Sequence, residues 1–268
     1  MFKRPEETYT CENSVLDAIL NDESSPHYNI LELIEDNSSI LDIGAGNGIL
    51  AQVLRKSGKS FQIDGIEPCA KACEIAAPYY RNLYQGYIQD YIDKINFEDY
   101  DYIVMADLIE HVSDPLDLLQ NISDQISAKT KVIIDVPNVS FASVRLSLLK
   151  GIWDYSDSGL IEKTHLRFFT KKTLLAMFKN ANFKVEKIIN LRHEYDKTEI
   201  PVQIGQYSWG TINEINQDKS SSVYQYLFIL SKGFEDAEIP IKDCGRSKKI
   251  YFFKYLIERI KYCLKHLF

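Results

Sequence analysis

Short apolar segments alternate with amphipathic segments between residues 40 and 137. The apolar runs have the length of buried strands, and the segments between them carry apolar residues at helical spacing. This alternation is typical of βα units in a parallel sheet. The pattern predicts strands at 40–43, 61–67, 82–86, 100–106 and 131–137, and helices at about 47–57, 69–77 and 114–127.

Two insertions interrupt the pattern after the fifth strand. Pro137 ends that strand, because proline cannot donate to a strand ladder. Residues 138–169 form an aromatic-rich segment with a short helical run at 142–150, and we expect this segment to be a lid over the substrate. The polar interval at 192–222 fits either a second lid or a loop without fixed structure. Before it the pattern predicts a helix at 171–180 and a strand at 183–191, and after it a strand at 223–231.

The expected fold is therefore an α/β domain with a doubly wound, mostly parallel sheet over residues 38–235, preceded by a helical cap at 1–37. Residues 236–268 are expected to form a basic amphipathic helix. From Arg246 onward this tail has seven lysines or arginines and one acidic residue, with apolar residues at helical spacing. Such a helix fits either an anionic membrane surface or a partner subunit, for example in a homodimer.

Composition narrows the class of protein. The formal charge of −7 argues against a nucleic-acid partner, because phosphate binding needs a basic surface. The N-terminus lacks the apolar core of a signal peptide, and no eighteen apolar residues run together. We therefore expect a cytoplasmic protein, which the C-terminal helix would be able to hold at the inner face of the membrane. The five cysteines form no CxxC pair, which favours reduced thiols.

The first strand leads into a glycine-rich turn, "ILDIGAGNGIL". Its glycines allow positive φ angles, so that backbone N–H groups can approach a ligand closely. A dinucleotide motif would read GxGxxG, but its last glycine is replaced by Ile49. Asp42 precedes the turn and Glu67 ends the next strand, where carboxylates suit an amino group and the two hydroxyls of a ribose. A nucleoside amino acid without phosphate fits this set better than the alternative, NAD in a dehydrogenase or epimerase.

Five segments resemble class I S-adenosylmethionine-dependent methyltransferases, in the family allied to ubiquinone-biosynthesis O-methyltransferases and bacterial envelope sugar methyltransferases. The segments are "ILDIGAGNGIL", "IDGIEP", "YDYIVMADLIEHVSDPLDLL", "VIIDVPNVS" and "THLRFFTKKTLLAMF". The resemblance implies a Rossmann-like fold, S-adenosylmethionine as cofactor and methyl transfer to an oxygen nucleophile. Relatives carry Gly-Asp where this chain has Gly86-Tyr87, so the adenine contacts depart from the family pattern. The implied cofactor residues are Asp42, Gly44, Ala45, Gly46, Gly48, Glu67, Pro68, Tyr87, Ile88, Asp90, Ala106 and Asp107.

A cluster of ionisable residues follows the fourth strand. Asp107, Glu110 and His111 are spaced at i, i+3 and i+4, so a helical turn would place them on one face beside the cofactor. Ordinary roles, such as a helix cap or a packed histidine, compete with a catalytic one. His165, in the lid, adds a second imidazole.

The resemblance implies that these four residues, Asp107, Glu110, His111 and His165, bind a divalent cation (Mg, Mn, Fe or Zn). Relatives use glutamate at the position of Asp107, so this residue departs from their pattern. Without a metal, His111 or His165 is the natural general base, because an imidazole titrates near neutral pH. Glu110, His111 and His165 are thus the expected catalytic residues in either case.

The lid indicates the class of acceptor. Arg145, Lys163 and Arg167 suit phosphate, and the aromatic residues Trp153 and Tyr155 suit stacking on a sugar or a base. Solvated surface charges and core aromatics are the ordinary alternative. We expect a sugar nucleotide or another phosphorylated metabolite, and a role in surface polysaccharide biosynthesis. A non-catalytic, cofactor-binding scaffold at the membrane remains a further alternative.

Overall fold

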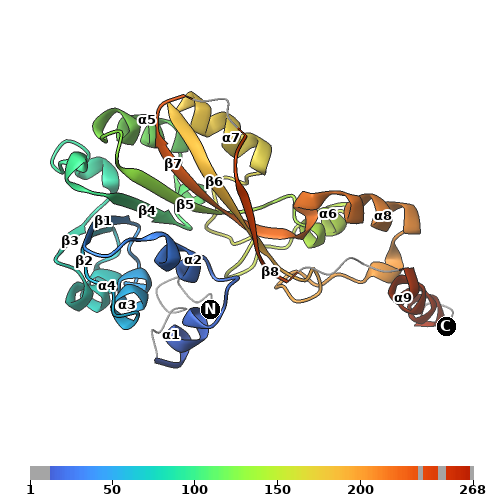
Figure 1. Cartoon of the computed structure of the whole chain (residues 1–268). Helices are drawn as coiled ribbons and strands as arrows, with labels where there is room; N and C mark the ends of the chain where they lie inside the picture. Colours follow the sequence, from blue (N-terminus) through green and yellow to red (C-terminus); the bar gives the residue numbers. More distant parts are fainter. Residues whose placement is uncertain (1–12, 235–237, 247–251, 266–268) are drawn as a thin grey trace.

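A computed structural model describes residues 13–234, 238–246 and 252–265. The described chain is built around an eight-stranded sheet with the order β3-β2-β1-β4-β5-β7-β6-β8 (Figure 1). Its strands are β1 (Ser38–Ile43), β2 (Phe61–Glu67), β3 (Asn82–Gln85), β4 (Tyr102–Ala106), β5 (Lys131–Pro137), β6 (Phe183–Arg192), β7 (Val223–Lys232) and β8 (Ile241–Gly245). The seven strands predicted from the sequence are confirmed, with small differences at their ends.

The sheet is mostly parallel, as predicted. Strands β1 to β5 pair in parallel, β7 runs antiparallel to both β5 and β6, and β8 pairs in parallel with β6. The direction of winding reverses at β1, which lies between β2 and β4. Ligands of open α/β sheets bind at such a reversal, beyond the carboxyl ends of the strands.

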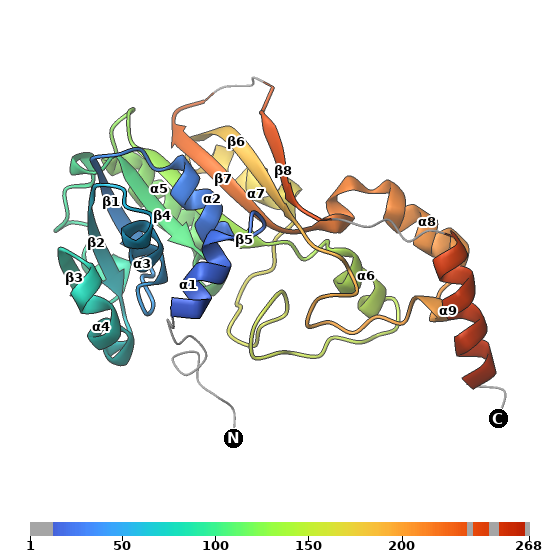
Figure 2. The ribbon, with the colours of Figure 1, turned by 60° about the horizontal axis from the view of Figure 1, so that its bottom comes forward.

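Helices cover both faces of this sheet (Figures 1 and 2). One face buries apolar side chains from α1 (Asn13–Leu20), α2 (Pro26–Leu33), α3 (Ile49–Lys56) and α4 (Ala70–Ala76). The other face packs against α5 (Pro115–Gln125) and α7 (Lys171–Asn180). Each helix buries one apolar stripe, as its periodicity requires, and the doubly wound α/β fold is confirmed.

The two insertions fold together beside the sheet and share a third apolar core. Helix α6 (Ala142–Leu148) comes from the lid, while the polar insertion contains α8 (Trp209–Gln217) and the short 3-10 turns η6 (Ile204–Gln206) and η7 (Lys219–Ser222). Apolar side chains from both insertions meet in this core, including Phe141, Leu160, Tyr195 and Ile212. The interval at 192–222 is therefore structured, and the alternative of a loop without fixed structure is wrong.

The C-terminal segment differs from the expected single helix. Strand β8 forms first and adds an edge to the sheet, and α9 (Phe252–Lys265) follows it. Most side chains of β8 are exposed, so no apolar alternation marks it in the sequence. Backbone pairing with β6 and the ion pair between Arg192 and Asp243 hold the strand in place. Within the described ranges, no helix combines the length and apolar character needed to cross a bilayer.

The predicted N-terminal cap begins, in the described chain, with α1 and α2. Both helices contact α3 and pack on the same face of the sheet, where Leu16 and Ile30 are buried. Residues 1–12 of the cap, with Cys11, lie outside the described residues, as does Leu267 at the end of the tail.

Candidate functional site

The turn between β1 and α3 closes onto the end of β2. Three of its glycines have positive φ angles: Gly44 (84°), Gly46 (51°) and Gly48 (78°). The N–H groups of Gly44 and Ala45 donate to the Ile66 carbonyl at 2.9 and 3.0 Å, and that of Gly46 donates to Glu67 Oε2 at 2.8 Å. These donors were expected to face a ligand, but the protein itself uses them. A phosphate-free cofactor does not need these three donors.

The individual glycines have different roles. A Cβ atom on Gly46 would meet no atom within 4 Å, so this residue faces open space. A Cβ atom on Gly48 would lie 3.2 Å from Ala76 Cβ and 3.3 Å from Tyr80. Gly48 therefore allows close packing of α3 against α4, while Gly46 leaves room for a ligand.

Two acidic side chains flank the turn. The buried Glu67 carboxylate accepts hydrogen bonds from Cys69 N–H at 2.8 Å and from Gly46 N–H, which fix its orientation. Asp42 Oδ2 accepts a hydrogen bond of 2.6 Å from the Tyr80 hydroxyl. Burial raises the pKa of Asp42 to about 7, against the opposing effect of Tyr80 and with a smaller contribution from the Glu67 charge. A cationic group in contact with Asp42 would favour its charged form.

These residues line a cavity of about 480 Å³ at the carboxyl ends of the strands. Its volume is within the usual range for small-molecule sites. Most of the predicted cofactor residues lie in its wall, namely Asp42, Gly44, Ala45, Gly46, Glu67, Pro68, Ala106 and Asp107. Gly48, Tyr87, Ile88 and Asp90 do not. Asp90 instead accepts a hydrogen bond of 3.0 Å from Tyr87 N–H and caps the turn η3 (Ile88–Asp90).

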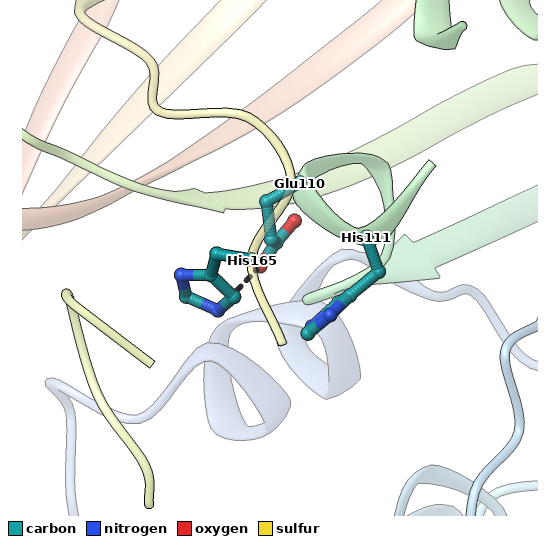
Figure 3. A group of neighbouring side chains, drawn as sticks. All are labelled: Glu110, His111 and His165. Atoms are coloured by element: carbon teal, nitrogen blue, oxygen red, sulfur yellow. Dashed lines mark ion pairs between the residues drawn. The ribbon is translucent and has the colours of Figure 1, made fainter. Parts of the chain in front are cut away.

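Glu110, His111 and His165 lie close together, and the two histidines belong to the wall of this cavity (Figure 3). Glu110 and His111 belong to the 3-10 turn η5 (Ile109–His111), and His165 comes from the lid. One ligand atom from each residue lies within 4.8 Å of the others. His165 Nε2 is 4.0 Å from Glu110 Oε1, and the two imidazole rings pack edge to face with centroids 4.8 Å apart.

Backbone hydrogen bonds hold the lid against this turn. The N–H groups of Leu166 and Arg167 donate to the Glu110 carbonyl oxygen at 2.8 and 3.0 Å. His111 Nδ1 lies 3.2 Å from the carbonyl oxygen of Thr164. Hydrogen bonds to the lid residues before and after His165 therefore fix its position relative to Glu110.

The carboxylate of Glu110 is buried, and neither of its oxygens has a hydrogen-bond partner in the described chain. Burial, followed by the charge of Asp107, raises its pKa well above the usual range. Burial, followed by the charge of His111, lowers the pKa of His165. An unpartnered buried carboxylate is costly, and a divalent cation between it and two imidazoles would remove that cost. The three residues therefore fit a cation site of mixed oxygen and nitrogen ligands.

The helical turn that the spacing predicted for Asp107, Glu110 and His111 does not include Asp107, and Asp107 is not one of the three residues whose ligand atoms meet. Its φ of 47° departs from a helical turn, which begins only at Ile109. The side chain points instead toward β7, where Gln225 Nε2 donates to Asp107 Oδ1 at 2.7 Å and to Asp135 Oδ2 at 3.0 Å. Burial, followed by the charge of Asp107, raises the pKa of Asp135 well above its usual range. The amide of Gln225 therefore links the two acids.

Sequence reasoning missed several residues of the cavity wall. His27, at the start of α2, is half-buried, and burial lowers its pKa to about 4, so it is neutral. Gln225 lines the cavity, and Asp135 lies behind it. Asp135 and Gln225 each interrupt an apolar strand in the sequence, and such a polar interruption is a signal that would have identified both.

The basic residues of the lid form contacts elsewhere. Arg145 pairs with Asp218 at 2.6 Å, Lys163 pairs with Asp157 at 2.5 Å, and Arg167 donates to the Ser113 carbonyl at 2.5 Å. Among the described residues that line the cavity there is no lysine or arginine. The predicted phosphate contacts from the lid are therefore not present in the wall of the cavity.

Comparison with known proteins agrees with this geometry. Residues 23–188, more than half of the chain, match a family described as a methyltransferase domain. The ubiquinone biosynthesis O-methyltransferase of Rickettsia bellii is 25% identical over 170 residues, which cover 62% of this chain and 68% of that protein. The protein of the same name from Rickettsia canadensis is 22% identical over 194 residues, which cover 70% of this chain and 79% of that protein.

Solved structures show the same fold. A SAM-dependent methyltransferase from Archaeoglobus fulgidus superposes with a TM-score of 0.58 at 18% identity, over 85% of this chain and 97% of that one. A possible histamine N-methyltransferase from Thermotoga maritima gives 0.55 at 14% identity, over 86% and 98% of the two chains. The family match excludes the alternative of an NAD-dependent dehydrogenase. The chain belongs to the methyltransferase domain family and is a class I S-adenosylmethionine-dependent methyltransferase.

Proposed function

We propose that the enzyme methylates a hydroxyl oxygen of an acceptor that carries two neighbouring hydroxyls, such as a sugar, with a divalent cation held by Glu110, His111 and His165. The carboxylate of Glu110 is the observation that carries this proposal, because it is buried without a hydrogen-bond partner and lies next to two imidazoles. The names of the Rickettsia relatives support oxygen as the acceptor atom.

The cofactor supplies an electrophilic methyl group on a sulfonium. Glu67 and Asp42 both line the cavity, and in this proposal Glu67 accepts hydrogen bonds from the ribose hydroxyls and Asp42 binds the amino group. The same cavity extends to His111 and His165, so an acceptor bound there would lie next to the reacting end of the cofactor. Methyl transfer is an in-line displacement, and most of its acceleration comes from such placement.

The hydroxyl must also lose its proton. A cation bound by Glu110, His111 and His165 would lower the pKa of a coordinated hydroxyl. In the protein without a cation, burial and the charge of His111 lower the pKa of His165 and so favour its neutral imidazole, which can accept a proton. A placed base contributes a factor of roughly 10² to 10⁴ to the rate.

The acceptor group inside the cavity is neutral. Its described wall contains acids, imidazoles and the amide of Gln225, but no lysine or arginine to neutralise a phosphate. Two neighbouring hydroxyls are able to coordinate a cation and to donate hydrogen bonds to carboxylates. A sugar therefore remains the proposed acceptor, any phosphate on it would lie outside the cavity, and a role in surface polysaccharide biosynthesis stays a prediction.

Matched acceptors test the proposal. The protein is incubated with S-adenosylmethionine labelled in its methyl group and with pairs of sugars and catechols that have either both hydroxyls or only one of them. We expect labelled products by mass spectrometry from the paired hydroxyls only, loss of product with a chelator, and recovery when Mg²⁺ or Mn²⁺ is added back.

Other outcomes have distinct meanings. Turnover that resists the chelator but is lost in His165→Ala would overturn the cation and assign the base role to His165. Cofactor binding without labelled product from any acceptor would favour the non-catalytic scaffold.

A further inference from the structure

Helix α9 packs against the protein through its polar and aromatic side. Tyr255 is its buried residue among the described ones, and its hydroxyl donates to the Tyr207 carbonyl at 3.2 Å. Arg259 donates to the Gly205 carbonyl at 2.7 Å, and Lys254 pairs with Asp196 at 2.6 Å. A surface helix normally buries its apolar stripe, so the packing of α9 is inverted.

The apolar stripe of α9 faces outward. At about 100° per residue, its exposed apolar side chains fall in one arc of about 140°. They are Phe252, Phe253, Leu256, Ile257, Ile260 and Leu264, of which Phe252 also packs edge to face against Trp209. Phe253 is 78% exposed and Ile257 54% exposed. A contiguous exposed apolar surface of this kind marks a contact with another molecule or with a membrane.

Lysines border one edge of this stripe. Viewed down the helix axis, Lys254, Lys261 and Lys265 lie in the arc directly next to the apolar one. The helix carries four basic residues and one acid, a charge of +3, whereas the whole chain carries −7, so the remaining residues carry −10. Figures 1 and 2 both show α9 at the end of the molecule opposite β3, with no further described helix or strand beyond it.

We propose that α9 binds an anionic lipid surface, with its apolar stripe in the interface and its lysines at the phosphate level. This surface is separate from the methyl-transfer site. Basic flanks and an apolar face are the two features of interfacial helices. A second copy of the chain is a poorer fit, because helix pairs use acidic and basic flanks together. The one acid of α9, Glu258, is already paired with Lys261 at 3.0 Å.

Vesicle binding by the full chain tests this proposal. Sedimentation compares vesicles of phosphatidylcholine alone with vesicles that also contain phosphatidylglycerol. We expect at least about tenfold tighter binding to the anionic vesicles, since each basic residue near such a surface contributes about 1 kcal/mol. Raising the salt concentration should reduce this difference, because salt screens the attraction.

Two sets of variants separate the apolar and charged contributions. The triple variant Phe253→Ser, Ile257→Ser, Ile260→Ser should bind at least about tenfold more weakly, because its apolar contact is lost. Lys261→Glu with Lys265→Glu should lose the preference for anionic vesicles. The matched controls are Val15→Ser with Ile75→Ser, and Lys71→Glu with Lys172→Glu, which change exposed residues outside α9. All variants should bind S-adenosylmethionine within about twofold of the wild type.

The proposal fails if the wild-type protein does not bind vesicles or binds both kinds equally. It also fails if the chain forms a dimer in solution that the triple serine variant dissociates, since the stripe would then bind a second copy. Equal loss of vesicle binding in the control variants would likewise exclude α9 as the specific surface.

Discussion

Glu110 Oε1 and His165 Nε2 lie 4.0 Å apart, although one belongs to the turn after β4 and the other to the lid. Main-chain hydrogen bonds fix this distance, because the N–H groups of Leu166 and Arg167 in the lid donate to the Glu110 carbonyl oxygen. The residue that would bind a cation is thus also the residue on which the lid is fixed. Changes to the Glu110 side chain should therefore affect the chemistry of the site without releasing the lid.

Glu110→Gln should separate cation binding from stability. Burial raises the pKa of Glu110 and so favours its neutral carboxyl in the cation-free protein, and the isosteric amide should change the free energy of unfolding by less than about 1 kcal/mol. The affinity for Mn²⁺, measured by calorimetry, should fall at least about tenfold, because one ligand is lost. Glu162→Gln changes a carboxylate elsewhere in the cavity wall and should have a smaller effect. Equal Mn²⁺ affinity in wild type and Glu110→Gln would exclude the cation site.

Gly46→Ala and Gly58→Ala form a matched pair for the cofactor cavity. Both glycines have positive φ, 51° and 80°, and a Cβ atom on either would meet no atom within 4 Å. Each substitution should cost about 1–2 kcal/mol of stability through backbone strain. Only Gly46 lines the cavity, so only Gly46→Ala should weaken S-adenosylmethionine binding, by about tenfold or more. Equal affinity of the two variants in calorimetry would show that the cofactor does not lie against Gly46.

Asp64 should make stability depend on pH. Burial alone would raise the pKa of this carboxylate, but hydrogen bonds from Arg81, Tyr100 and Asn82 outweigh it and lower the pKa. An acid with a lowered pKa in the folded state stabilises the protein above its unfolded pKa of about 3.9. This contribution disappears as the pH falls through the lower, folded value.

Asp64→Asn should therefore lose about 2–3 kcal/mol of unfolding free energy near neutral pH, and the loss should shrink toward about pH 3. Urea denaturation at several pH values measures this difference. Asp93→Asn, at an exposed position, is the control and should show little change. A loss that stays constant across the pH range would exclude the charge of Asp64 as its cause.

Gln225→Glu should destabilise the fold by about 2 kcal/mol or more, because it places a third carboxyl against Asp107 and Asp135. The wild-type amide donates to both acids, and a carboxylate cannot. Gln203→Glu, at an exposed position where the side chain accepts a hydrogen bond of 2.8 Å from the Gln206 amide, introduces the same chemical change and serves as the control. Chemical denaturation that gives equal stabilities for the two variants would show that Gln225 does not link the two acids.

Most of the fold could be predicted because its signals are local. Strand β2 follows a short apolar run, and α7 follows a helical apolar stripe that begins at the capping residue Thr170, so both were predicted at their observed ends. Strand β8 was missed because its residues are mainly exposed and only its pairing with β6 makes it a strand. Local periodicity carries no information about such an edge.

The amino-acid sequence by itself determined the alternation of strands and helices, the positive-φ turn at Gly44–Gly48, and the acids Asp42 and Glu67 at the ends of adjacent strands. Each of these depends on residues close together in the chain. The tertiary structure alone decided that Asp107 turns away from Glu110 toward Gln225, and that the lid brings His165 to Glu110. Those contacts join distant segments, and the strand pairing and lid packing that create them are properties of the whole fold.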